Sequence, residues 1–209
     1  AESSTEGIEV HRLGFKFSQN SNFRINLWDF GGQEIYHATH QFFLTKRSLY
    51  LLVVDARQDN ADFNYWLDII ELLSEGSPVL IIKNEKQDRT CSVSESQLRG
   101  RFSNLQGVLA TNLLTNRGLG AIGKKIKYYI SQLPHIGDLL PQTWIRVRKV
   151  LEEDTRNHIS QAEFLDLCET QGFKCRQDKL QLSGYLHDLG VFLHFQDERI
   201  MSLSYLRSN

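Results

Sequence analysis

The stretch WDFGGQEIYHATHQFFLTKRSLYLLVVDAR, residues 28–57, joins a polar, glycine-containing turn to a continuous apolar run. The run SLYLLVVD, residues 48–55, has the length of a strand and carries no charge before Asp55. Such a run is typical of a strand that helices cover on both faces. The stretch therefore indicates an open α/β sheet with acidic residues and glycines next to its strand ends.

Strand and helix patterns continue on both sides of this stretch. Residues 8–17 and 23–29 are rich in β-forming residues and flank the polar turn SQNSN, so they predict an antiparallel hairpin. Further helices are expected over 64–73, 96–102 and 119–133, and further strands at 79–83 and 108–110. The alternation predicts an α/β fold with a doubly wound sheet.

The last third of the chain has a different pattern. Residues 134–141 contain two of the three prolines and are expected to form a linker. Ser160, with Glu163 three residues on, is a capping box that predicts the start of a helix. The pattern outlines a small winged-helix-like α+β domain, with helices at 143–153, from 160, and at 177–189, and strands at 191–195 and 200–205.

This change of pattern sets the expected domain limits. We expect an α/β domain over residues 1–133, a linker over 134–141 and the winged-helix-like domain over 142–209. A chain of 209 residues has room for one such domain and a small second one.

Composition argues against several classes of function. With 24 basic and 25 acidic residues, the chain has no net attraction to nucleic acid or acidic lipid. The expected recognition helix of the winged domain, 177–189, offsets Lys179 with Asp178 and Asp188, which does not suit DNA reading. Three cysteines without CxxC spacing indicate reduced thiols and no zinc site. With neither a signal-peptide pattern nor an apolar run of ~20 residues, we expect a cytoplasmic protein without a membrane span.

Polar clusters follow the predicted strands at the ends where ligands bind in open α/β sheets. They lie at 29–34, at Asp55, at 83–88 and at 110–112. An acid such as Asp29 can hold Mg²⁺ through water, and Gly32 lets a backbone N–H approach a terminal phosphate. Gln33 can then orient an attacking water. Phosphoryl transfer depends on positioning and charge, so it needs no nucleophilic side chain here.

Four short motifs resemble those of Ras-like GTPases. DFGGQE, residues 29–34, resembles the DxxGQ motif, and TEGIEV, residues 5–10, resembles the end of switch I. NEKQD, residues 84–88, occupies the place of the guanine-reading NKxD motif, and ATN, residues 110–112, that of the SAK loop.

The resemblance implies a set of functional residues. It implies catalytic roles for Gln33 and Gly32 and metal binding by Asp29 and Thr5. It implies Mg²⁺ and GTP/GDP as cofactors, with nucleotide contacts at Thr5, Asn84, Glu85, Lys86, Asp88, Thr111 and Asn112.

Residues 28–57 resemble, more specifically, the Roc domain of Roco proteins, and the segment after Leu139 resembles the start of the COR domain. This resemblance implies a guanine-nucleotide switch that hydrolyses GTP slowly and passes its nucleotide state to COR. It also implies a homodimer through COR in the full-length protein, with leucine-rich-repeat or kinase domains in the parent chain.

Two departures from the family pattern leave an alternative open. The sequence has no GxxxxGK[ST] phosphate loop, so we expect a fragment or an upstream piece supplied from elsewhere. In NEKQD, Glu85 stands at the lysine position, and the aspartate position falls on Gln87 or, with one insertion, on Asp88. We favour guanine, read by Asp88. The alternative is a non-catalytic pseudo-GTPase that serves as a scaffold or interaction module.

Overall fold

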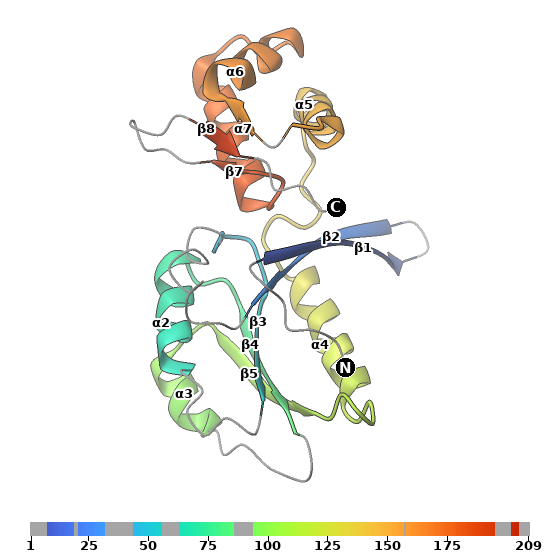
Figure 1. Ribbon diagram of the computed structural model, residues 1–209, viewed down its shortest axis with the longest axis vertical. Helices are drawn as coiled ribbons and strands as arrows, with labels where there is room; N and C mark the ends of the chain where they lie inside the picture. The colour runs from blue at the N-terminus through green and yellow to red at the C-terminus, as the bar shows by residue number, and fades with distance from the viewer. Residues whose placement is uncertain are drawn as a thin grey trace. The chain divides into compact units, whose positions relative to one another are not determined.

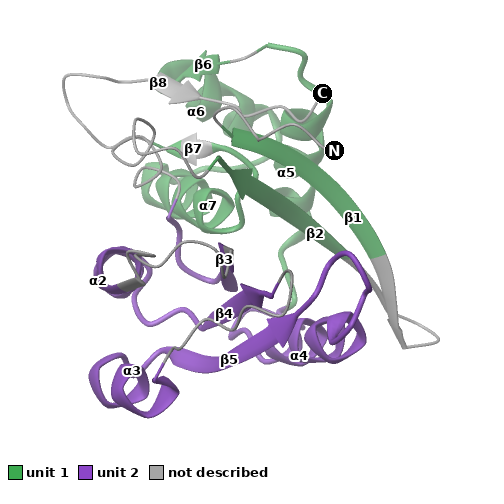
Figure 2. Ribbon diagram, turned by 60° about the horizontal axis from the view of Figure 1, so that its bottom comes forward, with its two compact units in different colours: residues 1–43, 139–209 green, residues 44–138 purple. Residues whose placement is uncertain are grey.

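The computed structural model describes residues 8–18, 21–31, 44–55, 63–85, 94–156, 158–194 and 202–204. The chain folds into two compact units, shown in Figure 2. Unit 1 comprises residues 1–43 and 139–209, and unit 2 comprises residues 44–138. The domain limits expected from the sequence follow motifs and not packing, and they stay a prediction.

Unit 2 is a parallel three-stranded sheet with helices on both faces (Figure 1). The strand order is β3-β4-β5, with α2 and α3 on one face and α4 on the other. The elements are β3 (Tyr50–Asp55), α2 (Phe63–Leu73), β4 (Val79–Asn84), α3 (Glu95–Arg101), β5 (Leu105–Thr111) and α4 (Leu119–Ser131). This arrangement confirms the predicted doubly wound α/β class.

The central strand β4 explains why the sequence needs continuous apolar runs. Val79 and Ile81 pack in the cluster that contains Leu67 of α2, whereas Leu80 packs with Ile122 of α4 on the other face. Because strand side chains alternate between faces, both sets must be apolar. Full burial of each such side chain contributes ~1.5–3 kcal/mol.

The expectation that residues 48–55 are buried on both faces is wrong in part. Val54 is 4% exposed, but Val53 is 62% exposed. The reason is the place of β3, which lies at the edge of the described three-stranded sheet and pairs there with β4.

The predicted antiparallel hairpin is confirmed. Strands β1 (Ile8–Ser18) and β2 (Ser21–Phe30) pair from Ile8↔Phe30 to Ser18↔Ser21. In the described residues they form a two-stranded sheet of their own, separate in hydrogen bonding from β3-β4-β5. By its packing the hairpin belongs to unit 1.

The remainder of unit 1 is the winged-helix-like domain. It contains α5 (Gln142–Glu153), β6 (His158–Ser160), α6 (Gln161–Thr170), α7 (Arg176–Asp188), β7 (Leu193–His194) and β8 (Ser202–Ser204). The strands form an antiparallel sheet in the order β6-β8-β7. Strand β6 was not predicted, because three residues are too few to show an alternating pattern. The core of the winged-helix-like domain includes the rings of Phe164 and Phe192, whose centroids lie 5.8 Å apart.

The predicted capping box at the start of α6 is confirmed. The Ser160 hydroxyl accepts from the Glu163 amide at 3.2 Å, and the Ser160 amide donates to the Glu163 carboxylate at 2.7 Å. The Ser160 backbone N–H, the Ser160 hydroxyl and Arg156 together lower the pKa of Glu163 to about 2. The box satisfies amides that a helix start otherwise leaves without partners.

Candidate functional site

Three polar residues line up at the carboxyl edge of the unit 2 sheet. Asp55 of β3 is the Cα partner of Asn84 of β4, and Asn84 is in turn the partner of Thr111 of β5. Parallel strands place their carboxyl ends at one edge, and ligands of open α/β sheets bind there. The structure thus brings together three of the four strand-end clusters that the sequence singled out, those at Asp55, 83–88 and 110–112.

Asn84 is fixed by the loop that follows β5. Asn84 is only 6% exposed, and its side-chain Oδ1 accepts a hydrogen bond from the backbone amide of Leu113 at 3.2 Å. Because the oxygen is used in this way, the amide nitrogen is the group that Asn84 can offer to a ligand.

Glu85 is held between two cations. Its carboxylate lies 2.7 Å from Nη2 of Arg117 and 3.7 Å from Nζ of Lys83, and only 12% of its side chain is exposed. Its amide donates to Thr111 O at 2.7 Å, which joins the end of β4 to β5. At the position where the NKxD motif has lysine, this chain therefore has an acid, with a positive charge supplied beside it by Arg117.

Thr111 and Asn112 shape the loop between β5 and α4. The fully buried Thr111 donates its hydroxyl proton to Arg117 O at 2.8 Å, and the Asn112 amide donates to the same carbonyl at 3.0 Å. Asn112 Oδ1 accepts from the amides of Leu114 and Thr115 at 3.0 and 3.2 Å. These bonds close the loop; nucleotide contacts by the two side chains stay a prediction.

Gly118 lets this loop turn into α4. Its φ is +80°, and a Cβ at this position would lie 2.5 Å from Ala110 O. Only glycine adopts this conformation at such a close approach without strain.

Gly118, Gly123 and Lys124 match GxxxxGK, the first part of the phosphate-loop pattern GxxxxGK[ST]. Gly123 and Lys124, however, lie inside α4, which begins at Leu119. In a phosphate-binding loop the glycines precede the helix, so its backbone N–H groups point at the phosphates. This segment of α4 is therefore not a phosphate loop.

Asp29 belongs to unit 1. It is the penultimate residue of β2, it is exposed, and its Cα partner on β1 is Glu9. The other predicted residues of the phosphate and base regions lie outside the described residues: Thr5, Gly32, Gln33, Lys86 and Asp88.

Within the described ranges, no three His, Cys, Asp or Glu side chains gather so that they could hold a metal ion. Mg²⁺ sites commonly use one or two carboxylates and complete their shell with water and substrate phosphates. The donor chemistry of Asp29 fits such a shared site.

Sequence reasoning missed Arg117 and Gly118. The polar tetrapeptide TNRG, residues 115–118, marks a turn but says nothing about a partner. The pairing of Arg117 with Glu85 joins residues 32 positions apart, and only the fold brings them together.

Family models match both parts of the chain. Residues 1–88 match the model described as "Ras of Complex, Roc, domain of DAPkinase", and residues 141–207 match "C-terminal of Roc, COR-A domain". In the described part of the chain, no helix combines the length and the hydropathy that crossing a membrane requires.

Several known proteins resemble the chain over most of its length. The probable serine/threonine-protein kinase pats1 of Dictyostelium discoideum is 22% identical over 91% of this chain, which spans 6% of that protein. A Roc-COR-CHAT protease of Runella zeae is 27% identical over 85% of this chain, which spans 21% of that protein. The solved structure of Methanosarcina barkeri Roco2 RocCORdC bound to GDP is 33% identical, with a TM-score of 0.89. That likeness covers 98% of this chain and 63% of the Roco2 chain.

Proposed function

Because the chain belongs to the Roco family, with a GTPase-type Roc domain followed by COR-A, we propose that it binds guanine nucleotide and hydrolyses GTP to GDP. The GDP in the Roco2 relative supports this proposal. The structural observation that carries it is Asn84, a buried amide at the sheet edge whose oxygen is already engaged by Leu113.

Base recognition follows from the chemistry of guanine. The base offers acceptors at N7 and O6, and Asn84 has amide hydrogens to donate. Asp88 would accept from N1–H and the N2 amino group, which adenine does not offer in the same form. Glu85 and Lys86, which lie between Asn84 and Asp88 in the sequence, add nucleotide contacts, and the loop of Thr111 and Asn112 backs the base.

The phosphate end of the proposed site uses the hairpin and the residues on either side of it in the sequence. Asp29 and Thr5 would hold Mg²⁺, which would neutralise charge on the phosphate oxygens. The Gly32 amide contacts the terminal phosphate, and Gln33 orients the attacking water. Loss of that phosphate releases the segments around Thr5 and Gln33, and COR-A passes the change to a homodimer.

The chain spans only 6–21% of the length of the curated relatives described above, so activity, dimer and attached domains of a whole protein are proposals. The 209 residues contain no GxxxxGK[ST] segment, so tight phosphate binding requires such a loop from the intact protein. An attached kinase domain agrees with the kinase names of two Dictyostelium discoideum relatives, and attached leucine-rich repeats remain part of the proposal.

Nucleotide binding and turnover in the intact protein test this function. We expect GDP in the purified protein by native mass spectrometry, and about tenfold weaker GDP binding in Asn84→Ser after loss of one hydrogen bond. Gln33→Ala should lower GTP turnover about 100-fold with little change in GDP affinity. The exposed Leu72→Ala on α2 is the control. An intact protein that binds no guanine nucleotide would refute the proposal.

The second candidate is a pseudo-GTPase scaffold. Glu85, which is ion-paired with Arg117, favours this second candidate because an acid stands where NKxD has its lysine. A scaffold would bind its partner equally well with and without nucleotide, and Gln33→Ala would leave any GTP turnover unchanged.

A further inference from the structure

The β1–β2 hairpin is anchored on the COR-A part of unit 1 by an ion-pair cluster. Arg24 donates through both terminal nitrogens to the two carboxylate oxygens of Glu152 on α5, one of them at 3.0 Å. Arg148 donates to the same carboxylate at 2.7 Å. Burial alone raises the pKa of Glu152, but the hydrogen bonds from Arg24 and Arg148 outweigh it and hold the pKa below its ordinary value.

A second anchor lies further along β2, at the end of α7. The Asn26 side-chain amide donates to Leu189 O at 3.3 Å and to Gly190 O at 3.4 Å. These carbonyls belong to the turn that leads from α7 to β7. His187 Nδ1 accepts a hydrogen bond from the backbone amide of His194 at 3.2 Å, which stabilises this turn.

Trp28 completes the contact because Gly190 has no side chain. A Cβ on Gly190 would lie 3.1 Å from Nε1 of Trp28 and 3.4 Å from two carbons of its indole ring. Gly190 also has φ +62°, so a larger residue would be strained as well as crowded. The glycine thus provides room for the indole.

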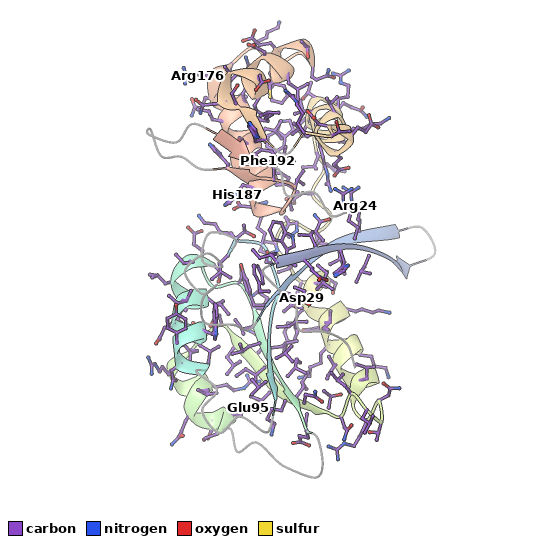
Figure 3. The ribbon with its side chains drawn as sticks, viewed as in Figure 1. Arg24, Asp29, Glu95, Arg176, His187 and Phe192 are labelled. Carbon is purple, nitrogen blue, oxygen red and sulfur yellow. The ribbon has the colours of Figure 1, made fainter. Side chains whose placement is uncertain are left out.

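All three anchors lie on one face of the strand. Side chains alternate along a strand, so Arg24, Asn26 and Trp28 share a face and Asp29 lies on the other. Figure 3 shows Arg24 and Asp29 on opposite sides of the hairpin. Asp29 is three residues beyond Asn26, about 10 Å along a strand. Any shift of the α7 end that moves Asn26 and Trp28 therefore moves Asp29.

We propose that Asn26 and Trp28 are positioning residues that tie Asp29 to the end of α7, so that the nucleotide state and the packing of COR-A are linked. The inference rests on the proposed nucleotide function. The link runs in both directions: if bound nucleotide changes the stability of the turn at 189–190, the state of that turn changes the nucleotide affinity by the same coupling free energy.

Hydrogen–deuterium exchange tests the anchor without nucleotide. In the 209-residue chain, Asn26→Leu and Gly190→Ala should each accelerate exchange about tenfold in residues 24–30 and 186–194. Asn26→Leu removes the hydrogen bonds to Leu189 O and Gly190 O, and the added Cβ of Gly190→Ala crowds Trp28. A loss equivalent to one or two hydrogen bonds corresponds to this factor. Leu27→Ala, next to Asn26 but on the opposite face, should leave residues 186–194 unchanged. Unchanged exchange in both Asn26→Leu and Gly190→Ala overturns the anchor.

The intact protein tests the link itself. Exchange in residues 186–194 should differ between the GDP state and a state with a non-hydrolysable GTP analogue, and Leu27→Ala should keep this difference. Asn26→Leu should abolish it while GDP binding persists, a result that a purely structural role would not produce. An equal difference in Asn26→Leu overturns the link. If the intact protein binds neither nucleotide, the proposed function fails and the link fails with it, while the exchange of the 209-residue chain still reports the anchor.

Discussion

Arg117 Nη2 lies 2.7 Å from the Glu85 carboxylate, between the end of β4 and the loop that precedes α4. This pair places opposite charges where the NKxD motif has a single lysine. The pair and the Thr111–Arg117 bond tie the same loop to the sheet edge.

Reversal of the charge at Glu85 should weaken this edge. Glu85→Lys puts three cations together, because Lys83 and Arg117 both face the position. Since Arg117 is 62% exposed, solvent screens the repulsion, and we expect a loss on the order of 1 kcal/mol in the free energy of unfolding. Urea denaturation measures it. The double variant Glu85→Lys, Arg117→Glu should recover most of the loss; a double variant no more stable than Glu85→Lys would contradict the pairing.

Gly118 and Gly120 offer a matched pair of substitutions at the start of α4. Gly118→Ala should destabilise the protein by about 1–3 kcal/mol, because alanine is strained at φ +80° and its Cβ meets Ala110 O. Gly120 has no neighbour within 4 Å of an added Cβ and lies inside the helix. Gly120→Ala should therefore stabilise the protein by up to about 1 kcal/mol. Thermal unfolding that shifts in the same direction for both variants would contradict this assignment.

Lys179 presents a buried charge with an exposed partner. Its side chain is 4% exposed, and Nζ pairs with Glu169, whose side chain is 66% exposed. Glu169→Gln weakens the charged hydrogen bond while the lysine stays buried, so we expect a loss of about 1–3 kcal/mol. Lys179→Met removes the buried charge and should be neutral or stabilising. Chemical denaturation of the two variants distinguishes them, and a stable Glu169→Gln would mean that Lys179 does not depend on this partner.

The stability of COR-A should fall with mild acid. Burial and the neighbouring His187 lower the pKa of His194 below 6.5, and its Nδ1 lies 2.9 Å from the Ser183 hydroxyl. As the pH falls, the imidazole of His194 binds a proton in the unfolded chain before it does so in the folded chain. The contribution of neutral His194 to the free energy of unfolding is therefore complete above pH 6.5. It is lost as the pH falls toward the lowered value.

The free energy of unfolding, measured between pH 7.5 and 5.5, tests the predicted loss of stability caused by His194. His194→Gln keeps a polar partner for Ser183 but does not titrate, so its stability should depend less on pH. Equal slopes for the variant and the parent chain would rule out His194 as the source.

Much of the fold was predictable because its signals are local. VLII at residues 79–82 is apolar throughout, as a strand with two covered faces requires, and Ser160 with Glu163 marks a helix start by direct hydrogen bonding. Strand β6 and the exposure of Val53 were not predictable. The first depends on pairing with β8, and the second on which strands lie beside β3.

The same distinction holds for the candidate site. The sequence placed Asn84 and Thr111 at strand ends, and the register of β4 and β5 brings them together. It could not show that Asn84 Oδ1 accepts from Leu113, because that bond depends on the conformation of a loop 29 residues away.

By itself, the amino-acid sequence determined the α/β class, the order of the elements, the winged-helix-like second part and the motifs of the family, since all of these show in local patterns of residue types along the chain. The tertiary structure alone decided that Arg117 pairs with Glu85 and that the face of β2 opposite Asp29 packs on α5 and the end of α7. These contacts join residues 32 to 164 positions apart. Their free energy depends on packing that no local pattern encodes.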